Sequence, residues 1–358
     1  MAKIIVGLSG GVDSAVAAYL LKMAGHEVIG VTLRTWILAD GQESRCCEID
    51  DAREISRKLD IPYHVISCAA DFRTNVTEPF VREYLSGRTP NPCTGCNRTV
   101  KWTKMLEAAD LMGAAYVATG HYAFVVQQPN GRYTVRQALH AEKDQTYMLY
   151  QLTQEQLSRT MMPLAKLSKE EVRRIAEAAG LSVAHKRDSQ EICFVPDGDY
   201  ASYIEEHAGT ELPGEGAFVD AEGHVLGKHR GIIHYTVGQR KGLGIALGRP
   251  AFVREIRADQ NEVVLSDDEA LYGREVFCGD LCFMSIPGLS EGERLRCFAK
   301  IRYRHAARAA ELEKTGDDGL ILHFDEPVRA AAPGQAAVFY DGEGCVIGGG
   351  VIRSPKNG

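Results

Sequence analysis

Short apolar runs alternate along the first half of the chain with stretches whose apolar positions recur every three to four residues. The short runs are typical of buried strands, and the recurring stretches are typical of amphipathic helices. The expected strands are residues 4–6, 28–31, 63–66 and 116–119, and the expected helices are residues 13–24, 51–59 and 102–111. Strands that alternate with helices predict a parallel sheet that is covered on both faces.

Further helices are indicated beyond this alternation. An apolar stripe of period four runs over residues 72–84, and Pro79 predicts a bend or break within it. Capping boxes begin at Thr153 and at Ser168, each with a Glu or Gln three positions later. We therefore expect the first domain to extend through a helical region to residue 204.

The pattern changes in the second half of the chain. Glycine becomes dense from Gly209 onward, and long helical periodicity is lost. Residues 295–303 place an apolar side chain at every second position, and the Asp341–Gly342 turn separates two strand-like runs. The expected domains are an α/β nucleotide-binding domain over 1–204, a small glycine-rich central domain over 205–272, and a C-terminal antiparallel β-barrel over 273–358.

Composition narrows the class of protein. The 358 residues suggest two or three domains, and 45% hydrophobic with 25% charged residues fits a soluble globular protein. No signal-like segment opens the chain and no run of 18 apolar residues occurs, so we expect a cytoplasmic protein without a membrane partner. In that compartment ten cysteines favour thiol or metal chemistry over a disulfide scaffold.

Two basic segments stand out in a chain whose formal net charge is -7. Residues 223–254 hold six Lys or Arg and no Asp or Glu, and residues 293–308 hold six against Glu293. By the two-residue strand period, Arg296, Lys300, Arg302 and Arg304 are expected to share one face. Such stripes suit contact with phosphates, although a solvated charged face is the alternative.

A glycine-rich loop, Ser-Gly-Gly-Val-Asp-Ser over residues 9–14, joins the first expected strand to the first expected helix. Glycines let the backbone approach a phosphate, and the N–H groups at the helix start point toward the anion. Asp13 is a candidate ligand for Mg²⁺ between phosphates. Alternatively, the segment is only a turn in which Asp13 and Ser14 cap the helix. No Gly-x4-Gly-Lys-Ser/Thr motif occurs, so that other phosphate loop is excluded.

Two cysteine segments place thiols beside cationic side chains, which lower the pKa of a thiol and raise its reactivity. One contains Cys93 and Cys96 before Arg98, and the other runs from Lys186 to Cys193. A lone cysteine is often a small buried hydrophobe, whereas Cys-x-x-Cys spacing is moderately indicative of redox or metal chemistry. The residue pattern alone leaves these readings open.

The loop resembles that of the N-type ATP pyrophosphatases, which have an adenine nucleotide alpha hydrolase-like fold. Together with the cysteine segments it resembles the tRNA-specific 2-thiouridylase family over almost the whole chain. The matching segments are residues 9–14, 91–97, 118–123, 143–147, 188–193, 234–240, 302–304 and 333–335.

That resemblance implies residue roles. Cys96 matches the catalytic nucleophile, and Cys193 matches the cysteine that carries a persulfide. ATP contacts are implied at Gly7, Leu8, Ser9, Gly10, Gly11, Val12, Asp13, Ser14, Leu33 and Gly120. Contacts with tRNA are implied at Asn91, Pro92, Cys93, His121, Lys143, Asp144, Gln145, Arg302, Tyr303 and Gln335.

The implied reaction is ATP-dependent 2-thiolation of the wobble uridine of tRNA. ATP adenylates the C2 oxygen, sulfur from a cysteine persulfide replaces it, and AMP and pyrophosphate are released. The implied partners are tRNA and a sulfur donor, either a cysteine desulfurase or a sulfur-relay protein, and the implied cofactors are ATP and Mg²⁺. An amide-forming ligase with the same loop, or a tRNA-binding protein without catalysis, is the rival interpretation.

Cys93 departs from the family, which commonly has Asp at this position. Three thiols, Cys93, Cys96 and Cys193, are enough to hold a [4Fe–4S] cluster that leaves one iron open to an extra sulfide. A single zinc ion on the same thiols is a weaker alternative, because closed zinc sites need four ligands. The adjacent Cys46 and Cys47 are interpreted as structural, with a redox or metal role left open.

Overall fold

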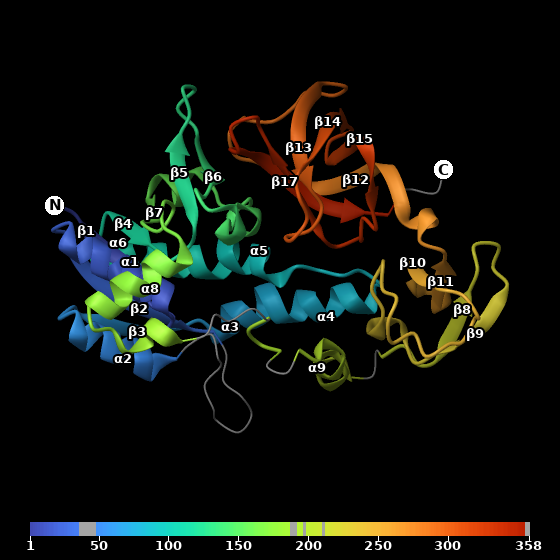
Figure 1. Ribbon diagram of the computed structural model, residues 1–358, viewed down its shortest axis with the longest axis horizontal. Helices are drawn as coiled ribbons and strands as arrows, with labels where there is room; N and C mark the ends of the chain where they lie inside the picture. Colours follow the sequence, from blue (N-terminus) through green and yellow to red (C-terminus); the bar gives the residue numbers. More distant parts are fainter. Residues whose placement is uncertain (36–47, 187–191, 196–197, 210–211, 355–358) are drawn as a thin grey trace.

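The computed structural model describes residues 1–35, 48–186, 192–195, 198–209 and 212–354. Figure 1 shows the α/β part in blue and green, the barrel in orange and red, and a small yellow sheet below the barrel. Helix α4 runs from the α/β part towards this small sheet. The helices are α1 Val12–Met23, α2 Ile49–Lys58, α3 Ala69–Phe72, α4 Glu78–Leu85, α5 Pro92–Cys96, α6 Thr103–Leu111, α7 Gln154–Ser158, α8 Lys169–Ala178 and α9 Tyr200–His207. The 3-10 turns are η3 Ala141–Lys143, η4 Thr146–Met148, η5 Ser182–His185, η7 Ile232–His234, η8 Ala258–Gln260 and η9 Glu269–Leu271.

A parallel sheet in the order β3-β2-β1-β4-β7 forms the core of the first domain. Its strands are β1 Lys3–Gly7, β2 Glu27–Arg34, β3 Tyr63–Ser67, β4 Tyr116–Ala118 and β7 Thr160–Met161. The predicted strands and helices of this region are confirmed to within three residues at their ends. The predicted parallel arrangement is confirmed as well.

Both faces of this sheet are covered. Ile4 and Val6 pack into the cluster that contains α1 and α8 residues, whereas Ile5 faces a second cluster that contains Trp102 and Met105. All three strand residues have no exposed surface, which explains why β1 is a continuous apolar run without alternation.

The stripe over residues 72–84 is helical, but Pro79 does not break it. A π-helical turn, η1 Arg73–Thr77, joins α3 to α4, and Pro79 lies at the start of α4, where its missing N–H is tolerated. A second π-helical turn, η2 Asn97–Trp102, joins α5 to α6. The hairpin of β5 Ala123–Gln127 and β6 Tyr133–Gln137 was not predicted, although Asn130–Gly131 is a hairpin signal.

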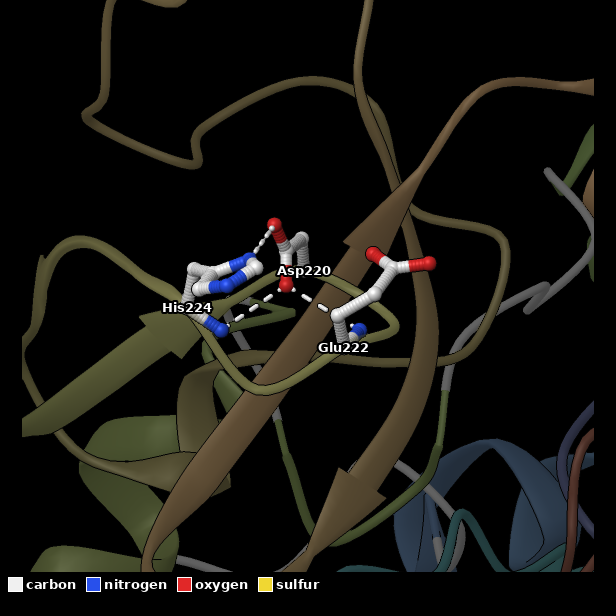
Figure 2. Close-up of side chains that lie close together, drawn as sticks. All are labelled: Asp220, Glu222 and His224. Atoms are coloured by element: carbon white, nitrogen blue, oxygen red, sulfur yellow. Dashed lines mark hydrogen bonds and ion pairs between the residues drawn. The ribbon is translucent and has the colours of Figure 1, made fainter.

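The central part is a small sheet in the order β10-β11-β8-β9. Its strands are β8 Gly216–Val219, β9 Val225–His229, β10 Phe252–Arg257 and β11 Glu262–Ser266. Figure 2 shows Asp220, Glu222 and His224 in the β8–β9 turn, the one group among the described residues with the ligand spacing of a metal site. Asp220 accepts hydrogen bonds from the backbone N of Glu222 (3.1 Å) and of His224 (2.8 Å), so the cluster closes the hairpin turn.

The C-terminal part is a closed antiparallel barrel in the order β12-β15-β14-β13-β16-β17, which confirms the predicted fold. Its strands are β12 Tyr272–Phe283, β13 Arg294–Lys300, β14 Arg308–Thr315, β15 Gly319–Arg329, β16 Ala336–Tyr340 and β17 Val346–Arg353. The alternation in β13 is confirmed, since Cys297 and Ala299 are buried and Arg296 and Phe298 are exposed. Within the described residues, no helix is long and apolar enough to cross a membrane.

The barrel rests directly on the first domain. Thr89 N donates to Pro333 O at 2.8 Å, and Tyr147 OH donates to Ala336 O at 2.8 Å. Gly334 has φ +92°, and a Cβ there would lie 2.9 Å from Thr89 N, so this contact requires glycine. The segment before α5 is therefore fixed by a barrel loop.

Candidate active site

The glycine-rich loop spans the gap between β1 and α1. Ser14 Oγ donates to Gly11 O at 3.0 Å and accepts from Ser9 N at 3.2 Å, which closes the loop on itself. Gly10 has φ +77°, and a Cβ there would lie 2.7 Å from Glu48 O. Gly11 is the N-cap of α1 and supplies no side-chain cap, so the first N–H groups of α1 remain available to an anion.

Leu8 and Val12, at the two ends of this loop, are buried in the α1 core. Thr32 of β2 donates to Leu8 O at 2.6 Å and accepts from Tyr63 OH at 2.8 Å. Leu33, the further implied ATP contact, is the next residue of β2 and packs partly buried against two core clusters. The loop therefore leaves a rigid sheet edge, and Leu33 lies beside it along β2.

Gly120 follows β4 and touches the first turn of α1. A Cβ at this position would lie 2.6 Å from Asp13 C and 2.7 Å from Ser14 N. Both atoms belong to the backbone, so a larger residue would displace the loop. The structure therefore places Gly120 at the loop that the resemblance assigns to ATP.

The carboxylate of Asp13 is held by two residues that the sequence analysis missed. Tyr122 OH donates to Asp13 Oδ1 at 2.6 Å, and Lys169 Nζ lies 2.7 Å from Oδ1 and 2.8 Å from Oδ2. Lys169 occupies the first turn of α8, directly after the capping residue Ser168. A cation at a helix N-terminus is disfavoured by the helix dipole, and this was a sequence signal that Lys169 has a partner elsewhere.

Cys93 and Cys96 lie on the short helix α5. Asn91 caps it by accepting a hydrogen bond from Cys93 N at 3.2 Å, and Pro92 occupies its first turn. Cys96 is buried and Cys93 is partly exposed. The local sequence Asn-Pro thus fixes where both thiols leave the backbone.

The structure brings Cys193 to the same region. Cys96 is part of the core cluster that includes Phe194, and the partly exposed Cys193 packs against that cluster. The two candidate sulfur-handling residues therefore both contact one apolar cluster, which extends from Cys68 to Leu265 of the central sheet. Residues 187–191 of the second cysteine segment, and Cys46 and Cys47, lie outside the described residues.

The three thiols do not have the spacing of a single tetrahedral ion. Zinc–sulfur bonds of ~2.3 Å would place the sulfurs ~3.8 Å apart. The Sγ atoms of Cys93, Cys96 and Cys193, all of them described, do not all lie within 4.8 Å of one another. The zinc interpretation is therefore not supported by the arrangement of these residues.

Asn97, directly after Cys96, was also missed. Its side chain is 2% exposed and its Nδ2 donates to Met148 O at 2.9 Å. Its Oδ1 has no hydrogen-bond partner among the described residues. Asn97 begins the π-helical turn η2, and such turns occur frequently at functional sites.

The side chains of Asp144 and Gln145, in the segment 143–145, form hydrogen bonds within the first domain. Asp144 is 5% exposed, and its carboxylate accepts from Thr146 Oγ1 at 2.7 Å and from Ala138 N at 3.2 Å. Gln145 Oε1 accepts from Tyr122 N at 3.0 Å. Lys143 is partly exposed. Asp144 and Gln145 thus bond to the protein itself.

His121 is a neutral imidazole. Its Nδ1 lies 2.9 Å from Thr119 Oγ1, and its ring packs against Trp102. Burial, aided by the nearby Lys101, lowers the pKa of His121 to about 3. Any contact of this side chain with RNA is therefore a hydrogen bond or a stacking contact, not a charge contact.

Arg302, Tyr303 and Gln335 link the barrel to the other parts of the chain. Arg302 Nη2 donates to Val237 O at 3.1 Å and to Ala330 O at 2.7 Å, and burial lowers the pKa of its guanidinium. Tyr303 OH donates to Asp144 O at 3.2 Å, and Gln335 Nε2 donates to Thr89 O at 2.8 Å. These three residues, for which the resemblance implies contacts with tRNA, thus form hydrogen bonds that join the domains.

The expected basic face on the barrel is wrong in part. Strand β13 ends at Lys300, so Arg302 and Arg304 do not continue its face. Arg296 forms a bidentate pair with Asp325 at 2.7 and 2.9 Å, and Arg294 pairs with two glutamates. These barrel cations are already neutralised.

The central segment differs in this respect. Five of its cations are exposed and form no ion pair with any described residue: Arg230, Arg240, Lys241, Arg249 and Arg254. Arg240 lies 5.9 Å from the centre of the Phe252 ring. This surface, here called the central basic surface, is the better candidate for phosphate contact.

Family models cover most of the chain. The model described as tRNA methyl transferase HUP domain matches residues 2–197. Those described as tRNA methyl transferase PRC-barrel domain and Aminomethyltransferase beta-barrel domain match residues 201–267 and 282–352.

Similar proteins match along the whole chain. The tRNA-specific 2-thiouridylase MnmA of Lachnoclostridium phytofermentans is 51% identical over 360 residues, with 98% of this chain and 99% of that protein covered. The protein of that name from Acetivibrio thermocellus is 50% identical over 359 residues, with 98% and 99% covered. The one from Clostridioides difficile is 46% identical over 357 residues, with 98% of each covered. The chain therefore belongs to the tRNA-specific 2-thiouridylase family.

Proposed function

We propose that this chain is a tRNA-uridine 2-sulfurtransferase, which uses ATP to replace the C2 oxygen of the wobble uridine in tRNA with sulfur. The observation that carries the proposal is the 51% identity to a tRNA-specific 2-thiouridylase over nearly the full length of both chains. The glycine loop, with α1 open to an anion, and the two thiols on one cluster supply the parts that this reaction needs.

The proposed reaction begins with activation. The C2 oxygen of the uridine attacks the α-phosphorus of ATP, and pyrophosphate leaves. Hydroxide is a poor leaving group, whereas AMP is a good one, so adenylation makes the later loss of the C2 oxygen feasible. The loop from Gly7 to Ser14, with Leu33 and Gly120, is the proposed nucleotide site.

Sulfur transfer follows. An external donor, a cysteine desulfurase or a sulfur-relay protein, leaves a persulfide on Cys193. The terminal sulfur attacks C2, AMP departs with the former C2 oxygen, and the Cys96 thiolate attacks Cys193 Sγ to release the thiolated base. Cys96 and Cys193 end as a disulfide, which an external thiol must reduce. Release of free sulfide by Cys96 before the attack on C2 is the other order of these steps.

The proposed RNA-facing residues are Asn91, Pro92 and Cys93 near the base, with the implied contacts at 121, 143–145, 302–303 and 335. The central basic surface supplies additional phosphate contacts. The domain limits 1–204, 205–272 and 273–358, and a cytoplasmic location, remain part of this proposal.

Mg²⁺ is proposed to accompany ATP, but not on Asp13. Both oxygens of that carboxylate already accept hydrogen bonds from Lys169 or Tyr122, so a metal ion ligated there would compete with these donors. We therefore place the ion on no side chain of this chain, and no step above passes through it.

The experiment is mass spectrometry of tRNA after incubation with ATP and a persulfide donor. We expect the wobble uridine to gain about 16 Da, the mass difference between one sulfur and one oxygen. This gain should be absent with Cys96→Ser and with Cys193→Ser. Cys282→Ser, which alters a partly exposed thiol on the barrel, is the matched control. Unmodified tRNA with consumption of an amine would instead indicate the amide-forming ligase.

The [4Fe–4S] alternative rests on Cys93 and has its own test. After anaerobic purification, stoichiometric iron and acid-labile sulfide that vanish in Cys93→Ala together with thiolation would replace the persulfide route. Iron-free protein that thiolates tRNA from a persulfide donor would eliminate the cluster.

A further inference from the structure

Lys169 is a cation in an unusual place. Its side chain is 11% exposed, and it lies in the first turn of α8, where the helix dipole disfavours positive charge. Removing an ammonium group from water costs free energy unless a partner compensates. The position of Lys169 therefore requires an explanation that α8 alone does not provide.

The partner of Lys169 belongs to the phosphate-binding loop. Its Nζ reaches both oxygens of Asp13, at 2.7 and 2.8 Å, across 156 residues of sequence. The Asp13 side chain is 32% exposed, so the ion pair lies at the open side of the loop. The pair brings a lysine ammonium to the start of α1, where an anion would bind.

Tyr122 fixes the geometry of this pair. Tyr122 is 2% exposed, and its OH donates to Asp13 Oδ1 at 2.6 Å. Its backbone exchanges two hydrogen bonds with Gln145, at 3.0 and 3.1 Å. The carboxylate is thus anchored on the sheet side by a rigid side chain and on the α8 side by Lys169.

The second lysine at this loop, Lys186, has different partners. Lys186 donates to Gly10 O at 3.3 Å, but its ammonium also contacts the carboxylates of Glu48 and Asp51. Lys186 is therefore surrounded by more negative than positive charge. Lys169 instead contacts both oxygens of Asp13, which lies in the first turn of α1.

We propose that Lys169 binds the phosphates of ATP at this loop, and that Asp13 and Tyr122 are positioning residues that hold its ammonium there. An ammonium group has three N–H donors, so Lys169 can keep a bond to Asp13 while it donates to a phosphate oxygen. This inference rests on the proposed function, because it requires ATP as a ligand. It assigns Asp13 the task of holding a cation instead of ligating Mg²⁺.

The test is equilibrium binding of ATP and of adenosine to the full-length protein, in buffer without divalent metal. Lys169→Met should weaken ATP binding by about tenfold or more and leave adenosine binding unchanged, because only ATP offers phosphates. Lys166→Met, an exposed lysine three residues earlier, is the matched control and should change neither. Equal loss for both ligands, or no loss for either, would overturn the proposal.

A second measurement does not depend on the folding of Lys169→Met. Asp13→Asn keeps Oδ1 as an acceptor for both Tyr122 and Lys169 and removes a negative charge, so metal-free ATP binding should not fall by more than about threefold. The gain in ATP affinity on adding Mg²⁺ should match that of the unaltered protein. Loss of that gain would make Asp13 a metal ligand and refute its positioning role. If the unaltered protein binds adenosine but not ATP, the proposed function fails as well.

Discussion

Substitution of Gly120 by alanine tests the contact between the loop after β4 and the phosphate-binding loop. The added Cβ would lie 2.6 Å from Asp13 C, 2.7 Å from Ser14 N and 2.9 Å from Asp13 O. Carbon atoms make ordinary contact at roughly 3.5 Å, so the two segments must separate by about 0.9 Å at Asp13 C. All three atoms are backbone, and no side-chain rotation can relieve the overlap.

Overpacking of this kind costs about 1–3 kcal/mol of the free energy of unfolding. For a domain of about 200 residues, that corresponds to a melting temperature roughly 2–12 °C lower. ATP binding should weaken as well, because the displaced atoms carry Asp13 and the first N–H groups of α1. Thermal unfolding and ATP titration measure the two effects.

Gly342→Ala is the matched control, because a Cβ at Gly342 meets no atom within 4 Å. It adds the same methyl group in a barrel turn and should change neither stability nor ATP affinity by a measurable amount. If Gly120→Ala melted within about 1 °C of the unaltered protein and bound ATP equally well, the close approach would not constrain the loop. The steric argument would then be refuted.

Further predictions concern RNA binding, pH and helix capping. Lys241→Ala should reduce the salt dependence of tRNA binding by about one charge. Arg296→Ala should leave it unchanged, because the Arg296 guanidinium is paired with Asp325. Equal slopes for the two variants would contradict the proposed difference between the central basic surface and the barrel cations. Burial lowers the pKa of His121 from 6.5 to about 3. Between those two pH values the unfolded chain is protonated at this residue and the folded chain is not. The free energy of unfolding should therefore decrease by up to ~1.4 kcal/mol for each unit by which the pH is lowered in this window. In denaturant titrations at several pH values, His121→Asn should flatten that slope. Ser168→Ala should cost about 1 kcal/mol in urea unfolding, since Ser168 accepts from Glu171 N at 3.2 Å, and an unchanged midpoint would contradict the cap.

Much of the fold could be predicted from the sequence because it depends on local periodicity. Four of the five strands of the first sheet, the capping boxes and the alternation of β13 follow from the spacing of apolar and capping residues, whereas the two-residue strand β7 was not predicted. The β5–β6 hairpin was missed although its turn dipeptide is present, because its short flanking runs do not alternate clearly. Of the bend or break predicted at Pro79, the break was not found, because the helical run continues through the π-helical turn η1 directly into α4.

The chemistry divides in the same way. The sequence by itself determined the phosphate-binding loop, the two thiol segments that follow it along the chain, and the family, since these are local motifs in a fixed order. Only the tertiary structure decided which groups meet: Lys169 with Asp13, Cys193 with the cluster of Cys96, and Arg302 with backbone carbonyls instead of solvent. These contacts join residues from 28 to 156 positions apart, and local spacing cannot encode them. They arise because the packing of the sheet, the helices and the barrel buries polar groups where these parts meet. Each buried polar group there needs a hydrogen-bond partner, which a distant part of the chain supplies.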